Sequence, residues 1–279
     1  MPHKIGFVDN SGGVLAHYKM LETIKDFASA NGWQVLRYKT DVENRELILK
    51  GVGYSGEEEI FVGFSTYHSV AADFYNLSVV GMTGYVPGNT LHTQPAARWS
   101  GIPCHNYYAD YWLDCSPQRI ALAIKAGTPV YESGYVGKIF PYATPGQYPY
   151  PLAVGGMLNG NTGTRYSETS HSIPYKGARA NLGLLFNSGA WLQPECWPWN
   201  NTFLAGATTQ NRDTGNEYAL NPVVLSDVNG VYGELEGVFH ISGFNNVVEN
   251  TLEIDGISYV VIQDVGRTDF NDYYALRMN

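Results

Sequence analysis

The sequence predicts an α+β protein that is mainly β, with antiparallel sheets, one N-terminal helix and long ordered loops. The chain of 279 residues holds 21 tyrosines, 31 glycines and 14 prolines. Aromatic side chains suit a pleated sheet, whereas glycine and proline interrupt helices and form turns. Helical periodicity is convincing in one segment near the N-terminus, and alternating strand patterns recur through both halves of the chain. These observations together favour sheets over helices.

The N-terminal segment predicts a strand, a helix and a second strand. Residues 5–8 are apolar, and apolar residues then recur at helical spacing over 15–28. Asn31-Gly32 is a stop signal, because glycine accepts the left-handed conformation common at helix C-termini. Residues 33–38 alternate as a strand.

Further strands are predicted in the first half of the chain. Residues 46–50 and 60–66 carry strand patterns, and the acidic turn at 54–58 between them predicts an antiparallel hairpin. Residues 73–85 are rich in aromatic and β-branched side chains and end at Pro87-Gly88. We therefore expect another strand there.

Residues 118–125 fit both a helix and a strand. The alternation of Ile120, Leu122 and Ile124 and the early stop at 127–129 favour the strand. Residues 130–140 should then pair back against it.

The second half begins with loops and ends with strands. Turn-forming residues are dense at 159–164 and 194–201, which predicts long ordered loops with short strands over 158–216. Asp255-Gly256 between alternating runs predicts a two-residue type I′ hairpin. Strands are expected at 223–225, 231–241, 251–254, 257–263 and 273–278.

The order of these elements predicts two lobes. Residues 1–140 form an α/β N-terminal lobe with β-hairpins, and residues 141–279 form a lobe that is loop-rich at first and then β-rich. The Tyr/Pro/Gly segment at 140–156 joins them. Its prolines restrict the backbone, so we interpret it as a brace, either between the two lobes or against a neighbouring chain.

Charge and hydropathy exclude several classes of partner. The net charge is −9 with 17 basic residues that are scattered along the chain, which argues against specific nucleic-acid recognition. No run approaches the ~20 apolar residues needed to span a bilayer, and the N-terminus carries no signal-peptide pattern. We expect a protein that is made in the cytoplasm and does not enter a membrane.

Three cysteines, Cys104, Cys115 and Cys196, form neither a Cys-x-x-Cys pair nor a finger-like spacing. We expect them to be reduced and buried. A bridge between Cys104 and Cys115 stays open, because spacing does not show whether their Cβ atoms approach.

No motif predicts catalysis, a metal or a cofactor. The loop at 9–13 lacks both nucleotide-binding fingerprints, and the serines and histidines form no recognisable triad. The cluster Cys104, His105, Asp110, Asp114 and Cys115 matches no zinc motif, so buried cysteines with exposed aspartates are the expected arrangement. The sequence thus predicts a protein that is not an enzyme.

Aromatic residues are the candidate binding residues. Trp191, Trp197 and Trp199 could form a sugar-stacking platform, but aromatic residues are also enriched at protein interfaces where charge is depleted. Charged residues make up 15% of the chain, which favours the interface. The candidate interface residues are Tyr142, Tyr148, Tyr150, Trp191, Trp197 and Trp199.

The chain resembles a family of tailed-bacteriophage virion structural proteins. The resemblance is strongest over 130–156, which includes Phe140-Pro141-Tyr142-Ala143-Thr144-Pro145-Gly146-Gln147-Tyr148-Pro149-Tyr150-Pro151. Further similar segments lie at 24–33, 58–63, 118–125, 221–225, 232–239, 242–244, 266–269 and 273–277.

The resemblance implies a virion component made in the cytoplasm of the bacterial host, located in the neck, collar, tail or baseplate. Such a subunit forms a homo-oligomer and contacts other virion proteins, usually in a ring or layer. The alternative is a receptor- or glycan-binding module of the tail. Tryptophans of the 191–199 region gathered in one groove would favour the sugar, whereas dispersed tryptophans would favour assembly.

Overall fold

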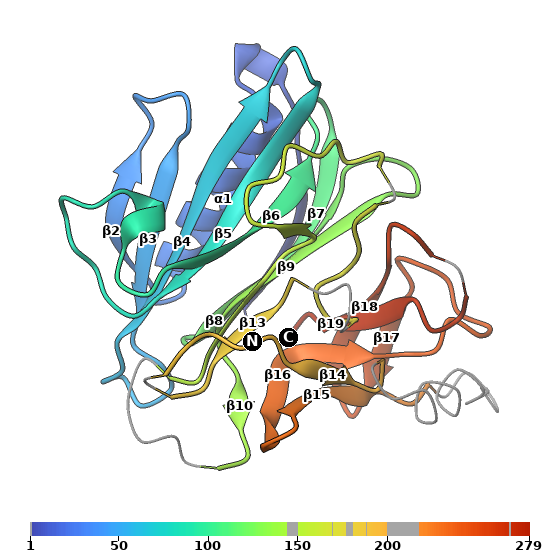
Figure 1. Cartoon of the computed structure of the whole chain (residues 1–279). Coiled ribbons are helices and arrows are strands. Elements are labelled where there is room, and N and C mark those ends of the chain that lie inside the picture. The colour runs from blue at the N-terminus through green and yellow to red at the C-terminus, as the bar shows by residue number, and fades with distance from the viewer. Residues whose placement is uncertain are drawn as a thin grey trace.

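The computed structural model describes residues 2–143, 150–168, 170–176, 181–187, 189–199, 218–267 and 269–279. Within these ranges the chain forms one α-helix and three antiparallel sheets, which Figure 1 shows as successive layers. Most of the regular structure is strand, so the predicted α+β, mainly β class is confirmed. No helix in the described ranges is long and apolar enough to cross a membrane.

The first layer, which we call the helix-side sheet, follows the predicted N-terminal hairpins. Its strand order is β12-β6-β5-β4-β3-β2. The strands are β2 (Gln34–Lys39), β3 (Glu46–Gly51), β4 (Ile60–Ser69), β5 (Phe74–Met82), β6 (Arg98–Cys104) and β12 (Leu158–Asn159).

Helix α1 (Ala16–Ala30) packs between this sheet and the next one. Its buried residues include Met20, Leu21 and Ile24, which share one face at helical spacing. The helix ends where predicted: Gly32 has a φ of 92°, and the Trp33 N–H donates to the Ala28 carbonyl at 3.1 Å. Two short 3₁₀ turns, Ser11–Gly13 and Leu91–Thr93, lie in the connecting loops.

The central sheet is covered on both faces, and its strand order is β1-β7-β8-β9-β11-β13. Ile120, Leu122 and Ile124 face the core shared with α1, whereas Ala121 and Ala123 face the opposite core. The choice of strand over helix for 118–125 is thus confirmed. The strands are β1 (His3–Val8), β7 (Ala109–Cys115), β8 (Arg119–Lys125), β9 (Tyr131–Lys138), β11 (Leu152–Gly155) and β13 (Gly183–Leu185).

The C-terminal sheet closes the other face of the central sheet and has the order β14-β15-β16-β19-β18-β17. The β17–β18 turn has positive φ at Asp255 and Gly256 (52° and 74°), which confirms the predicted type I′ hairpin. Its strands are β14 (Glu195–Trp197), β15 (Asn221–Asp227), β16 (Gly230–His240), β17 (Thr251–Ile254), β18 (Ile257–Gln263) and β19 (Tyr273–Arg277), with β10 (Phe140–Pro141) beside β16.

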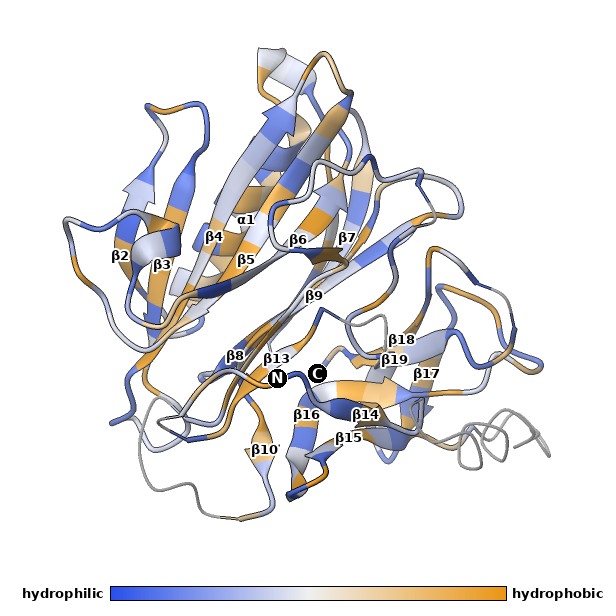
Figure 2. Cartoon of the chain, viewed as in Figure 1, coloured by the Kyte–Doolittle hydropathy of each residue, from blue (hydrophilic) through white to orange (hydrophobic). Residues whose placement is uncertain are grey.

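Strand pairing interleaves around the predicted lobe boundary at residue 140. Strand β10 joins the C-terminal sheet, whereas β11 and β13 return to the central sheet and β12 joins β6. The division into lobes stays a prediction. Figure 2 shows hydrophobic residues along the strands of all three layers, consistent with cores on both faces of the central sheet.

Strands β6 and β7 were not predicted. All three cysteines are buried and free, which confirms the reduced state and leaves no bridge between Cys104 and Cys115. The expectation of exposed aspartates was wrong for Asp114, which is fully buried on β7. Asp114 tolerates burial because a cation from the next strand, Arg119, is its partner.

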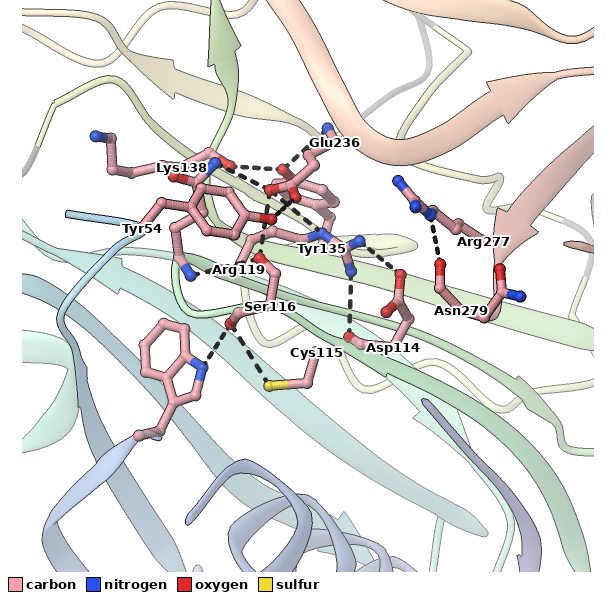
Figure 3. A network of polar contacts seen from close by, with 12 residues as sticks. Tyr54, Asp114, Cys115, Ser116, Arg119, Tyr135, Lys138, Glu236, Arg277 and Asn279 are labelled. Carbon is pink, nitrogen blue, oxygen red and sulfur yellow. Dashed lines mark hydrogen bonds and ion pairs between the residues drawn. The ribbon is translucent and has the colours of Figure 1, made fainter. Parts of the chain in front are cut away.

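Arg119 is fully buried between the central and C-terminal sheets (Figure 3). Its Nη2 donates to Asp114 Oδ2 at 2.5 Å, and its Nε lies 3.8 Å from Glu236 Oε2 on β16. Gly237 makes this approach possible, because a Cβ there would collide with the guanidinium. The two carboxylates therefore hold one buried cation from two different sheets.

Glu236 also accepts hydrogen bonds from uncharged side chains in the same network (Figure 3). Gln118 Nε2 donates to Glu236 Oε2 at 2.9 Å, and Tyr54 and Ser116 also donate to its carboxylate. Burial raises the pKa of Asp114, whereas the neighbouring Arg119 charge opposes that rise. The network links the loop before β4, the central sheet and the C-terminal sheet.

We predict that Arg119→Met lowers the free energy of unfolding by about 3–5 kcal/mol, because it leaves two carboxylates without their buried cation. Adding Asp114→Leu should recover part of this loss. Urea unfolding measures both effects, and Arg165→Met is the control, since the exposed Arg165–Asp73 pair should contribute at most about 1 kcal/mol. A loss at Arg119 no larger than that at Arg165 would contradict the prediction.

Candidate functional site

A polar groove opens where β6 begins. Two adjoining hollows of about 470 and 440 Å³ share Arg98, Asn159 and Asn181. We call them together the Arg98 groove. Its lining residues are Ala97, Arg98, Trp99, Met157, Leu158, Asn159, Gly160, Thr162, Thr164, Ser170, His171, Asn181, Trp191 and Gln193.

Glycines let the second wall of the groove lie directly on β6. A Cβ at Gly156 would lie 2.6 Å from the Gly101 carbonyl oxygen, and a Cβ at Gly101 would lie 2.8 Å from the Gly160 carbonyl oxygen. In this close approach Ser100 Oγ donates to the Leu158 carbonyl at 2.5 Å. The glycines after residue 155 thus allow β12 and the turn that follows it to form one wall of the groove.

Arg98 is a half-buried cation without a counter-charge. No described residue accepts a hydrogen bond from its guanidinium or forms an ion pair with it, and burial alone lowers its pKa. Its Cζ lies 5.9 Å from the centroid of the Trp191 ring. Arginine stays charged despite such a shift, so the groove presents an uncompensated positive charge.

Two tryptophans border this charge. Trp191 is held by its indole N–H, which donates to the Ala96 carbonyl at 2.8 Å. Trp99 is 37% exposed, and its ring meets His92 edge-on with centroids 4.9 Å apart. Both rings line the same hollow as Arg98, so it combines apolar walls with a cation.

A buried acid–base pair lies below the groove. His171 lines the groove, and its Nε2 lies 3.0 and 3.1 Å from the two carboxylate oxygens of Glu132 on β9. Burial raises the pKa of Glu132 from 4.5 to about 7, and the contact with His171 opposes that rise. No described serine, threonine or cysteine hydroxyl or thiol is hydrogen-bonded to His171.

Metal-binding geometry is absent from the part of the chain that the structure describes. No three His, Cys, Asp or Glu side chains gather there closely enough to hold a metal ion. In the region of the candidate cluster at 104–115, Asp114 is committed to Arg119.

The second surface feature is the outer edge of the central sheet. Among the described residues strand β1 pairs with β7 alone, and Ile5 and Phe7 on its outer face are 59% and 58% exposed. The Phe7 ring stacks on Tyr108 with centroids 5.0 Å apart, and Tyr108 is 52% exposed. We call Ile5, Phe7 and Tyr108 the edge patch.

The backbone of β1 is open along the same edge. The Cys115 N–H donates to the Pro2 carbonyl at 3.1 Å. Because antiparallel bonding alternates, Lys4, Gly6 and Val8 also point their backbone groups toward β7. The N–H and C=O groups of His3, Ile5 and Phe7 therefore point outward, where no described residue bonds to them.

The predicted interface residues are dispersed. Tyr142 is exposed and donates to Glu234 at 2.7 Å, Tyr150 is half-buried against the first core, and Trp197 is half-buried on β14. Trp199 is 8% exposed and donates to the Asn271 carbonyl at 2.7 Å, so it is a core residue. Tyr148 lies outside the described residues.

We predict that the contribution of Glu132 to the free energy of unfolding depends on pH. Its folded pKa of about 7 lies above the unfolded value of 4.5, so between these values the folded state holds a proton that the unfolded state has lost. The contribution of Glu132 to stability therefore falls as pH rises through this window.

Urea unfolding at about pH 5 and about pH 8 tests this prediction. As the pH rises between these two values, the free energy of unfolding of Glu132→Gln should increase relative to that of the unmodified protein. The exposed control Glu57→Gln should show no such change. A constant difference at both pH values would contradict it.

Sequence reasoning identified one groove residue, Trp191, and missed Arg98, Trp99, Asn159 and Asn181. The adjacent Arg98-Trp99 pair in a chain of low charge was the available signal. Trp191 and Trp199 belong to different packing clusters, on the first and second cores. No known family model matches this chain, and no curated protein is similar to it.

Proposed function

We propose that the chain is a structural component of a tailed-phage particle, in the neck, collar or tail, and that it acts through subunit–subunit contacts in a ring or layer. The resemblance of 130–156 and of the C-terminal runs to virion proteins suggests the class. The observation that carries the proposal is the open backbone edge of β1 together with the edge patch.

An unprotected edge strand is unusual, because soluble proteins shield edges with charges, prolines, bulges or short strands. Strand β1 carries one charged side chain, Lys4, but it pairs with β7 in unbroken register over six residues and has no proline. By contrast β2, of equal length, has a register shift at Val35/Arg37. The edges β12, β13, β14 and β17 are shorter, and β13 is bonded to Leu192. These differences make β1 the edge best suited to a contact.

The sequence of β1 suits pairing with a second copy of itself. Antiparallel pairing centred on Gly6 aligns the outward-pointing residues of one copy with those of the other. It places Ile5 opposite Phe7 of the second copy. Large apolar cross-strand pairs stabilise such a ladder. The resulting dimer would be a repeating unit of the ring or layer.

The charge and the tryptophans also support assembly. Charged residues make up 15% of the chain, and depletion of charge lowers the desolvation cost at the centre of an interface. Trp191 and Trp199 lie on different cores, so the three tryptophans of 191–199 do not form one platform.

A second candidate function is the binding of a host glycan. It is favoured by a different observation, the Arg98 groove, in which Trp99 and Trp191 border a polar hollow. Aromatic walls with a few polar groups are typical of ligand sites.

We predict that Ile5→Lys combined with Phe7→Lys weakens self-association at least about tenfold, because like charges would oppose each other in the paired edge. Analytical ultracentrifugation measures the dissociation constant. Val228→Lys is the matched control, since Val228 is 99% exposed in the turn between β15 and β16.

Antibody labelling of purified phage particles tests the location. Signal at the neck, collar or tail is expected. A protein that stays monomeric at high concentration would contradict the β1 contact, and its absence from particles would contradict the virion assignment itself.

A further inference from the structure

We propose that the Arg98 groove binds a saccharide that carries a carboxylate. This inference deepens the second candidate function and does not depend on the β1 contact. It rests on three properties of the groove: an uncompensated arginine, two indole rings of which Trp191 is fixed by a hydrogen bond, and a neutral polar wall.

The charge of Arg98 calls for an anionic ligand. Partial burial of a cation is costly unless an anion or several hydrogen-bond acceptors compensate it. None of the described groove-lining residues is an aspartate or glutamate. The nearby Glu132 is fully buried, and both of its oxygens are directed at His171. A ligand carboxylate could pair with the guanidinium through two parallel hydrogen bonds.

The indole rings favour a sugar over a simple anion. Trp191 lies beside Arg98 and is fixed by its bond to the Ala96 carbonyl, and Trp99 lines the same hollow. A pyranose ring has a flat face of C–H groups that packs on an indole, and an indole fixed in advance loses little conformational entropy on binding. An inorganic anion would use Arg98 and leave both rings uncovered.

The remaining wall suits hydroxyl groups. Asn159 and Asn181 line both hollows, and Thr162 lines one of them. Asn181 Nδ2 donates to the Met157 carbonyl at 2.9 Å, which orients its amide. Volumes of about 470 and 440 Å³ fall within the range of about 300–1,000 Å³ typical of ligand pockets. The groove therefore has space for more than one sugar ring.

Stability separates a binding role from a structural one. If Arg98 served the fold, Arg98→Gln would destabilise the protein. Because the described structure gives Arg98 no acceptor, we expect Arg98→Gln to melt at or above the temperature of the unmodified protein.

The binding experiment uses an oligosaccharide of alternating uronic acid and N-acetylhexosamine, together with the same oligosaccharide after reduction of its carboxylates to alcohols. Isothermal titration calorimetry should give at least about tenfold tighter binding of the acidic form. Arg98→Gln should abolish this preference, and Trp99→Ala should weaken the binding of both forms. Arg277→Gln on β19 and Trp197→Ala on β14 are the matched controls.

The outcomes distinguish the inference from the function on which it rests. Equal binding of both forms, unchanged in Arg98→Gln, would overturn the acidic ligand and leave glycan binding standing. Failure of both forms to bind would overturn the acidic ligand and the glycan-binding function together. A lower melting temperature of Arg98→Gln would show that Arg98 stabilises the fold, and it would contradict the binding role.

Discussion

The burial of Arg119 between two sheets is the interaction on which the rest of the structure depends. A guanidinium removed from water needs its counter-charges in place, and here they come from two layers: Asp114 from β7 and Glu236 from β16. The C-terminal sheet must therefore sit where β16 reaches the central sheet. Gly237 permits this approach because any side chain there would collide with the guanidinium. Apolar packing brings the layers together, and the contacts of Arg119 join the central sheet to the C-terminal sheet.

The central sheet is covered on both faces, so a surface that binds a partner must lie at its edges or elsewhere on the molecule. The inner strands β8 and β9 are almost entirely buried, so they supply cores and offer no surface. Two of the surfaces that remain are the outer edge at β1 and the groove at the start of β6. They lie on different strands and have different chemistry: apolar side chains with open backbone groups at β1, and a cation with indoles and amides at Arg98. The two surfaces could therefore bind different partners without competition between them.

Arg98 and Arg119 illustrate how burial alone does not reveal a role. Arg119 is fully buried and has two carboxylates, which is the pattern of a residue that serves the fold. Arg98 is half-buried and has none among the described residues, and burial is the one cause that lowers its pKa. Because an unpaired charge costs stability, its position beside Trp191 suggests that the partner is a ligand.

The local features of this fold could be predicted from the sequence because each depends on neighbours along the chain. Residues 118–125 alternate with a period of two, Asp255-Gly256 specifies its own turn, and Gly32 ends its own helix. The candidate site could not be predicted in the same way. Arg98 and Trp99 meet Trp191 across more than ninety positions, and Trp199 is buried because Asn271 and His240 lie over it. Asp114 is buried because Arg119 and the C-terminal sheet enclose it. Partners so distant come together through the pairing of strands, which a local pattern does not encode.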